Sequence, residues 1–343
     1  MTALTQNVLF LSIEDLNDWI EPLGGHPDTI TPNMQRLADR AALFTAAYTP
    51  APACSPARTA ALFGKYPWET GVYGNQQRWT DHFGGRQDQS IIGRFKSAGY
   101  RTIGAGKVFH GPSHDETTTC WDEFLPLDEG PPTAVSKAIQ QNKMRPKNDF
   151  GPTPENAEIF DQQATNFILN GMKTGSTGQF WALGLYRPHL PFIVPQRFFD
   201  AIPTQVANPP GLGLNNFDAN NTTLWEHLPK AARKMAKAWL NTGRILQETD
   251  EYHDFIRAYL ASIHYADFLL GQVLDHMDEH NLWENTHLVL WSDHGWQLGE
   301  KLMFRKFSLW ERALRVPLMI AGPTITPTTI DIPVSLVDLA QRF

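Results

Sequence analysis

Cysteine is scarce in this sequence of 343 residues, which contains only Cys54 and Cys120. Two cysteines cannot build a disulfide scaffold, and any disulfide bond would have to join these two residues. Disulfide crosslinking is therefore excluded as the organising principle of the fold. A special chemical role for one of the two cysteines becomes a hypothesis.

Long apolar runs are also missing. No segment reaches the roughly 18 apolar residues that a membrane-spanning helix needs. The N-terminus enters a strand-like segment, residues 7–13, without a basic region or a cleavage site. We therefore expect no membrane partner. We expect a cytoplasmic location for the chain as given, or a periplasmic or secreted one if a signal peptide was removed.

Basic residues are outnumbered, with 29 Lys and Arg against 36 Asp and Glu, for a formal net charge of -7. This balance argues against a dedicated nucleic-acid binder and against a long polyanionic substrate, although an acidic protein can still contain a local basic pocket. We expect a small ligand and no nucleic-acid partner.

Segments of strand length alternate along the chain with segments of helical periodicity. This alternation predicts an α/β fold with a large, mostly parallel sheet, helices on both of its faces, and ligands bound at the carboxyl ends of the strands. The length fits one domain over residues 1–343. We expect strands at 7–13, 101–105, 180–185 and 287–291. We expect one helix of about three turns that starts at Thr31-Pro32 and extends to Ala41, and further helices at 58–63, 154–169, 254–280 and 334–343. The segments 117–147 and 195–224 should be loops over one face.

Acidic residues follow two of the expected strands. Glu14 and Asp15 come directly after the first strand, and Asp293 and His294 come after the strand at 287–291. Because the carboxyl ends of parallel strands meet at one edge of a sheet, these side chains should lie close together. Oxygen-rich clusters suit a hard divalent cation, whereas either pair alone is more typical of solvated loop residues.

The segment Cys54-Ser55-Pro56-Ala57-Arg58 resembles the Cys-x-Pro-x-Arg motif of type I sulfatases, members of the alkaline phosphatase superfamily. The other matches run in the family's order from residue 7 to residue 317, and their wording is similar to the branch that contains iduronate 2-sulfatase. The resemblance implies an alkaline-phosphatase-like fold and a formylglycine made from Cys54 by a formylglycine-generating enzyme. It also implies one divalent cation, Ca²⁺, with ligands from Glu14, Asp15, Cys54, Asp293 and His294. Glu14 departs from the usual Asp, and Ala57 from the usual Ser.

The same resemblance assigns roles to the basic residues. Lys107 and His110 match the family's Lys-x-x-His, His189 lies in a segment like the family's Lys-Pro-His-x-Pro-Phe, and Lys306 matches a late lysine. Together with Arg58, these side chains are expected to orient the sulfate or the hydrated aldehyde. The attacking oxygen would come from residue 54, the leaving alcohol's proton from His189 or Lys306, and His110 would be the base that regenerates the aldehyde. For each basic residue alone, a packed histidine or a solvated lysine is the alternative.

The family usually continues into a small C-terminal subdomain, which we expect to be missing here. Either the chain is truncated, or the remainder is a separate C-terminal fragment, or this member lacks the subdomain. The implied activity is hydrolysis of the sulfate ester of a small sugar or alcohol. Two alternatives stay open: a phosphonate or phosphodiester hydrolase of the same superfamily, and a catalytically silent sulfatase-like binding protein, which Glu14, Ala57 and the missing subdomain favour.

Overall fold

The computed structural model describes residues 6–82, 86–110, 119–127, 136–209, 218–219, 221 and 223–341. Within them a sheet of nine strands crosses the molecule. Its strands are β1 (Asn7–Ile13), β2 (Ala41–Tyr48), β3 (Arg101–Gly106), β4 (Glu123–Pro126), β6 (Gln179–Leu185), β8 (Thr286–Ser292), β11 (Arg315–Ala321), β12 (Thr328–Ile330) and β13 (Val334–Ser335).

The strand order is β12-β2-β11-β8-β1-β6-β3-β4, with β13 beside β2. Among the described strands of this sheet, only β11 runs antiparallel to its neighbours, β2 and β8 on either side. The central strand β1 pairs in parallel with β8 on one side and β6 on the other, so that Phe10 faces both Val289 and Ala182. The predicted, mostly parallel sheet is therefore confirmed.

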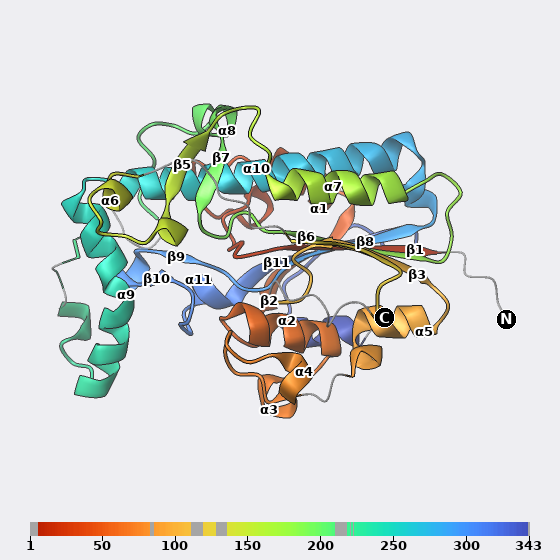
Figure 1. The fold of residues 1–343 in the computed structure, drawn as a ribbon, viewed down its shortest axis with the longest axis horizontal. Helices are drawn as coiled ribbons and strands as arrows, with labels where there is room; N and C mark the ends of the chain where they lie inside the picture. Colours follow the sequence, from red (N-terminus) through yellow and green to blue (C-terminus); the bar gives the residue numbers. More distant parts are fainter. Residues whose placement is uncertain are drawn as a thin grey trace.

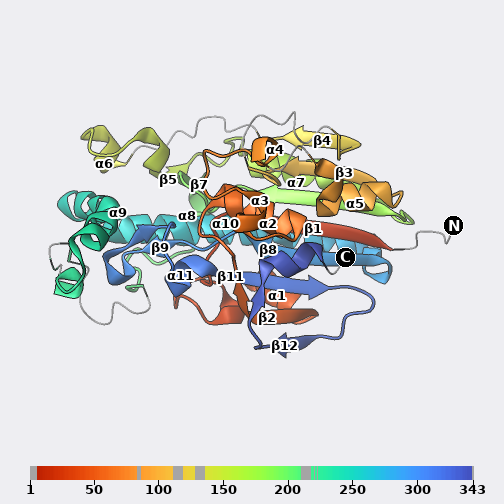
Figure 2. The ribbon, with the colours of Figure 1, turned by 90° about the horizontal axis from the view of Figure 1, so that it is seen from below.

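Helices cover both faces of the sheet (Figures 1 and 2). One face carries α1 (Pro32–Ala38), α7 (Phe160–Gly171) and α10 (Tyr252–Glu279), and the other carries α2 (Cys54–Phe63), α3 (Pro67–Thr70), α4 (Trp79–His82) and α5 (Ile91–Ser97). Alternation along β1 explains this arrangement, since successive side chains of a strand point to opposite faces. Leu9, Leu11 and Ile13 enter one hydrophobic core, whereas Val8 and Phe10 enter the other.

Shorter elements lie mainly beyond the carboxyl end of β1, on the side away from its N-terminus in Figure 1. They include the parallel pair β5 (Phe150–Thr153) and β7 (Phe192–Pro195), and the antiparallel pair β9 (Gln297–Leu298) and β10 (Phe304–Arg305). The remaining helices are α6 (Lys137–Gln140), α8 (Gln196–Asp200), α9 (Lys230–Glu248) and α11 (Glu311–Leu314), and the 3-10 helices are Glu21–Leu23, Gln87–Gln89, Pro146–Asn148, Thr223–Trp225, Leu282–Glu284, Glu300–Leu302 and Leu336–Ala340.

The helix predicted from Pro32 to Ala41 is shorter than expected, because Ala41 already begins β2. Thr31 does not cap it with its side chain. The carboxylate of Asp267 on α10 accepts hydrogen bonds from the backbone amides of Asn33 and Met34, at 3.1 and 2.7 Å, and so caps α1 from outside.

Other boundaries also moved. The helix predicted at 154–169 begins only at Phe160, because β5 and a turn occupy the residues before it. The helix predicted at 334–343 is wrong: β13 pairs with β2, and a short 3-10 helix follows it. The segments predicted as loops contain β4, α6 and α8, and parts of both lie outside the described residues. β2, β11 and α9 were not predicted.

No helix within the described ranges is long and apolar enough to cross a membrane.

Candidate active site

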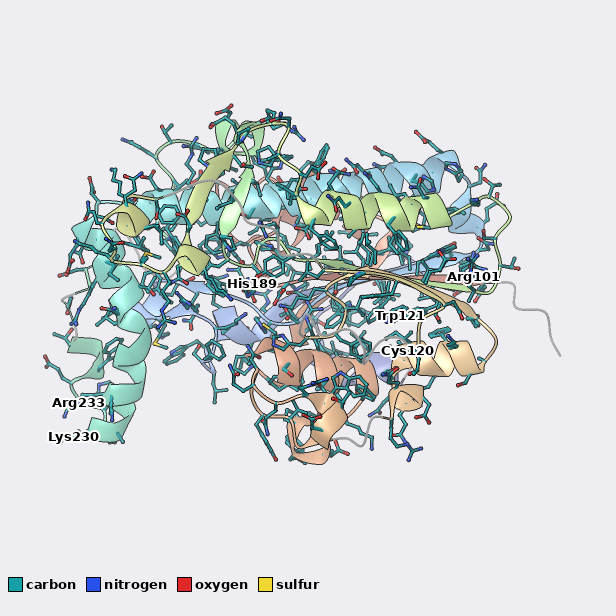
Figure 3. The ribbon with its side chains drawn as sticks, viewed as in Figure 1. Arg101, Cys120, Trp121, His189, Lys230 and Arg233 are labelled. Atoms are coloured by element: carbon teal, nitrogen blue, oxygen red, sulfur yellow. The ribbon has the colours of Figure 1, made fainter. Side chains whose placement is uncertain are left out.

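Four neighbouring strands of the sheet, in the order β8-β1-β6-β3, deliver their carboxyl ends to one place. Asp293 and His294 follow β8, Glu14 and Asp15 follow β1, the loop with His189 follows β6, and Lys107 follows β3. Figure 3 shows His189 just beyond the strands, between the two helical layers. The predicted meeting of the acidic clusters at this edge is confirmed by the contacts described below.

Cys54 is the first residue of α2, so this helix begins four residues before the helix predicted at 58–63. The helix begins early because Pro56 fits the first turn and because Asn75 Oδ1 accepts the otherwise unpaired backbone amide of Ser55, at 2.9 Å. Cys54 is only 1% exposed. Its Sγ lies 2.9 Å from Lys306 Nζ and 3.3 Å from His294 Nε2, so it occupies the centre of the cluster.

The carboxylates of Glu14 and Asp15 are fully buried, and each keeps one oxygen, Glu14 Oε2 and Asp15 Oδ2, without a hydrogen-bond partner. Buried carboxylate oxygens are normally paired, so these two oxygens are suited to bind a cation. Potential ligand atoms of Glu14, Asp15, Cys54 and His189 lie within 4.8 Å of one another, as do those of Cys54, Asp293 and His294. The residues therefore fit a divalent metal, and the longer side chain of Glu14 still reaches the cluster.

Arg58 and Asp293 form a buried ion pair, in which Arg58 Nε donates to Asp293 Oδ2 at 3.0 Å. Arg58 also donates to Ser12 Oγ and to the backbone carbonyls of Lys107 and Val108. The other carboxylate oxygen, Asp293 Oδ1, accepts the backbone amides of Asp15 and His294 at 3.1 and 3.0 Å. Arg58 thus joins the ends of three strands, while the substrate-orienting role expected for it stays a prediction.

The hydrogen bonds of two histidines define their tautomers, because a backbone carbonyl can only accept. Nδ1 of His294 lies 3.1 Å from the carbonyl oxygen of Gly295, and Nδ1 of His189 lies 2.5 Å from that of Leu190. Each Nδ1 therefore carries the hydrogen. The lone pair on Nε2 of each neutral ring then faces the cluster, as a metal ligand or a proton acceptor requires.

Two lysines complete the cluster. Lys107 Nζ pairs with Glu14 Oε1, and Lys306 Nζ donates to Asp15 Oδ1 at 2.7 Å. Lys306 lies between Arg305 and Phe307, which both have left-handed φ angles of 68°, an uncommon conformation for residues other than glycine. The amide of Phe307 donates to the carbonyl of Pro52 at 3.0 Å, which ties this turn to the segment before Cys54.

His110 is close enough to the charged residues of the cluster, among them Lys107 and Glu14, for their charges to affect its pKa. Burial is the main cause that lowers its pKa, to about 3, and the charge of Lys107 lowers it further. Its Nδ1 is buried without a hydrogen-bond partner. The ring is therefore neutral at pH 7 and able to accept a proton.

Burial and neighbouring charges shift the pKa values of the other site residues in different directions. Burial opposes ionisation of Glu14, but Lys107 and other cations hold its pKa well below the usual range. Burial raises the pKa of Asp15 and raises that of the Cys54 thiol to about 12. Burial also lowers the pKa of His189 to about 3. Against the effect of its own burial, Asp15 and other anions raise the pKa of Lys306, so it stays an ammonium.

The cluster holds as many formal cations as carboxylates. The carboxylates are Glu14, Asp15 and Asp293, and the cations are Arg58, Lys107 and Lys306. A bound divalent cation would leave this site with a net positive charge. Such a site attracts an anionic ester even though the whole chain is acidic.

Two sets of supporting residues were not predicted from sequence. The carboxylate of Asp161, on α7, accepts the backbone amides of Tyr186 and Arg187 at 2.6 and 3.0 Å, and thereby anchors the loop with His189. A second set anchors the segment with Lys306: Arg312 pairs with both Asp18 and Glu300. No sequence signal marks Asp161, whereas Asp18 lies in the polar stretch after the first strand.

The chain is similar to known proteins along almost its whole length. The Sulfatase family model matches residues 6–343. A sulfatase of Formosa agariphila is 33% identical, over 97% of this chain and 67% of the relative, and mouse iduronate 2-sulfatase is 30% identical, over 92% and 59%. The chain thus spans about three fifths to two thirds of these relatives.

Among solved structures, the phosphonate monoester hydrolase of Agrobacterium radiobacter superposes with a TM-score of 0.74 at 18% identity, covering 97% of this chain and 72% of that one. This likeness shows that the two proteins share a fold, and it confirms the predicted α/β fold class with a large, mostly parallel sheet. Because the family model covers nearly the whole chain and curated sulfatases match it at 30% identity or more, the chain belongs to the sulfatase family.

Proposed function

We propose that the protein hydrolyses the sulfate ester of a small sugar or alcohol, using a formylglycine at position 54 and a bound divalent cation, Ca²⁺. One observation carries this proposal. The side chain of residue 54 lies within 3.3 Å of both Lys306 Nζ and His294 Nε2, at the edge where two buried carboxylates each have an unpaired oxygen. A nucleophile, cations and metal ligands therefore converge on one point.

A bound cation and a formylglycine at position 54 would each supply part of the chemistry. A cation held by Glu14, Asp15, Asp293 and His294 would neutralise negative charge on the sulfate oxygens. A hydrated formylglycine at position 54 would supply the nucleophilic hydroxyl. The donor set is dominated by oxygen once the thiol has been converted, which suits a hard cation such as Ca²⁺. Conversion requires a formylglycine-generating enzyme as a partner during maturation.

The chain's own residues would handle charge and protons. Lys107 and Lys306 would bind the sulfate oxygens, where negative charge must be stabilised in the transition state. Two residues were expected to protonate the leaving alcohol. Lys306 is a cation at neutral pH and has a proton to donate. His189 is neutral, so its Nε2 must first gain a proton before it can donate one. His110, which is neutral, would accept the proton that must leave residue 54 before sulfate is released.

Phosphonate or phosphodiester hydrolysis is the second candidate, because a phosphonate monoester hydrolase shares the fold. A phosphodiester and a sulfate monoester both carry one negative charge, so the charge of the site does not separate them. A silent binding protein is the third candidate. It is less supported, since every residue expected to act in catalysis is present.

The first experiment is the intact mass of the peptide spanning Cys54 after coexpression with a formylglycine-generating enzyme. Conversion should lighten this peptide by about 18 Da. The converted protein should then be assayed in parallel on an aryl sulfate and on a phosphodiester. We expect the sulfate to be the better substrate.

Each alternative has its own outcome. A faster phosphodiester reaction would replace the sulfatase assignment with the second candidate. A converted peptide with tight binding of a sulfated sugar and no turnover would favour the silent protein. An unconverted peptide would mean that the motif with Ala57 is not recognised.

Replacement of Asp161 should impair catalysis from a distance. In Asp161→Asn, the side-chain NH₂ replaces one of the two oxygens that accept hydrogen bonds from the backbone amides of Tyr186 and Arg187. That hydrogen bond is lost and two donors face each other, which should cost about 1–3 kcal/mol of stability. We expect kcat to fall about 10- to 100-fold, by analogy with outer-shell partners of other sites.

The Asp161→Asn measurement combines kcat and KM with the shift in melting temperature that calcium causes. The four ligands proposed for the cation, Glu14, Asp15, Asp293 and His294, follow β1 and β8 and not β6, so this shift should persist. A loss of activity that merely follows the unfolded fraction would contradict a positioning role.

A further inference from the structure

The unconverted form of the protein has its own chemistry, because the Cys54 thiol replaces an oxygen donor with sulfur. Hard cations prefer oxygen ligands, whereas thiolate and imidazole together favour zinc. We propose that the chain with an unconverted Cys54 binds Zn²⁺ through Cys54 Sγ, His294 Nε2 and Asp293 Oδ2, and that conversion of Cys54 abolishes this site.

The spacing of the donor atoms fits zinc. Nε2 of His294 lies 3.3 Å from Cys54 Sγ and 3.5 Å from Asp293 Oδ2. A tetrahedral zinc with bonds of about 2.3 Å to sulfur and 2.0–2.2 Å to nitrogen and oxygen holds its ligand atoms about 3.4–3.6 Å apart. The two distances from His294 Nε2 are therefore close to those of a zinc site, and the third, between Cys54 and the Asp293 carboxylate, is within 4.8 Å and has to close to about 3.6 Å on binding.

The ligands are also oriented as zinc ligands usually are. Metal-binding histidines typically donate their other N–H to a carbonyl or a carboxylate. His294 donates Nδ1–H to the carbonyl of Gly295, which leaves Nε2 facing Cys54. The carboxylate of Asp293 is held by two backbone amides through Oδ1 and by Arg58 through Oδ2.

The neighbouring carboxylate of Asp15, whose backbone amide donates to Asp293 Oδ1, is the candidate for the fourth ligand. Asp15 and Cys54 belong to a group whose ligand atoms lie within 4.8 Å of one another, and Asp15 Oδ2 is buried without a hydrogen-bond partner. Binding exchanges the thiol proton for the metal: the Cys54 S–H bond breaks, a zinc–sulfur bond forms, and the proton passes to the buffer. Lys306 Nζ, 2.9 Å from Sγ, keeps its other partner, Asp15 Oδ1.

The chain contains its own control. Cys120 is also buried, but Figure 3 shows it well away from His189 at the site. The test uses metal-free protein expressed without a converting enzyme, and compares wild type with Cys54→Ala and Cys120→Ala. Cobalt(II), the spectroscopic substitute for zinc, should give a thiolate-to-cobalt charge-transfer band in the near ultraviolet.

We expect this band in wild type and in Cys120→Ala, and its absence in Cys54→Ala and in fully converted protein. Zinc affinity should fall about 100-fold or more in Cys54→Ala, since even outer-shell changes cost 10- to 100-fold. Excess calcium should not displace the zinc from the unconverted chain. Circular dichroism checks that the variants are folded.

A band that survives in Cys54→Ala, or one missing from unconverted wild type, would overturn the assignment. X-ray absorption at the zinc edge of wild type provides a test that needs no variant, and should show one sulfur ligand at about 2.3 Å. A spectrum with oxygen and nitrogen alone would also overturn it. Zinc binding by the unconverted chain does not depend on sulfate hydrolysis, so either can fail without the other.

Discussion

Cys54→Ala should abolish turnover of the sulfate ester, lowering kcat about 10⁴-fold or more, as loss of the nucleophile does in other hydrolases. Alanine has no thiol, so its Cβ cannot be converted to an aldehyde. Its side chain also has no oxygen or sulfur atom that could attack the sulfate ester. The substitution keeps α2 intact, because alanine is a good helix former and Cys54 contributes no backbone cap. The measurement is steady-state hydrolysis of an aryl sulfate by protein expressed with the converting enzyme.

Cys120→Ala is the matched control, since it also removes a buried thiol. Its product should convert normally at Cys54 and retain wild-type kcat. If Cys54→Ala kept more than about one percent of the activity, the nucleophile would have to be another residue, and the proposed function of position 54 would be wrong.

Asp293→Asn should weaken both the metal site and the fold. The substitution removes a charged ligand, so we expect calcium affinity to fall about 100-fold. It also leaves Arg58 buried without its partner, and breaking a buried ion pair costs about 3–5 kcal/mol. The shift in melting temperature on adding calcium reports the first effect, and the free energy of unfolding in denaturant reports the second.

The stability effect of Asp293 should depend on pH. Against the effect of burial, neighbouring cations, among them Arg58 and Lys306, lower the pKa of this carboxyl below its value in the unfolded chain. Its stabilising contribution is therefore complete above a pH of about 4 and is lost as the pH falls through the folded-state pKa. The difference in stability between wild type and Asp293→Asn should shrink accordingly in acid.

Asp338→Asn, at an exposed position, is the control and should change neither the calcium affinity nor the free energy of unfolding. A calcium shift that persists in Asp293→Asn would remove Asp293 from the ligands.

Periodicity predicted the central strands well and the edges poorly. β1, β3, β6 and β8 are almost entirely buried, so their apolar composition marked them in the sequence. β2 and β11 were missed. β2 begins at Ala41, a residue whose spacing also fits the apolar face of the preceding helix. β11 contains Pro317, which argues against a strand when only the sequence is considered. The C-terminal segment was misassigned because its apolar residues suit either a helix or the short strand that β2 pairs with.

For the site, local motifs and family resemblance identified the residue types, because metal binding and sulfate chemistry need carboxylates, imidazoles and cations in recognisable contexts. The sequence alone could therefore determine the fold class, the family and the residues around Cys54. Only the tertiary structure decided how they are held. The capping of α1 by Asp267, the anchoring of the His189 loop by Asp161 and the pairing of Arg58 with Asp293 join residues that lie between 25 and 235 positions apart. Such contacts depend on how helices pack across the sheet, and local sequence patterns carry no information about that packing.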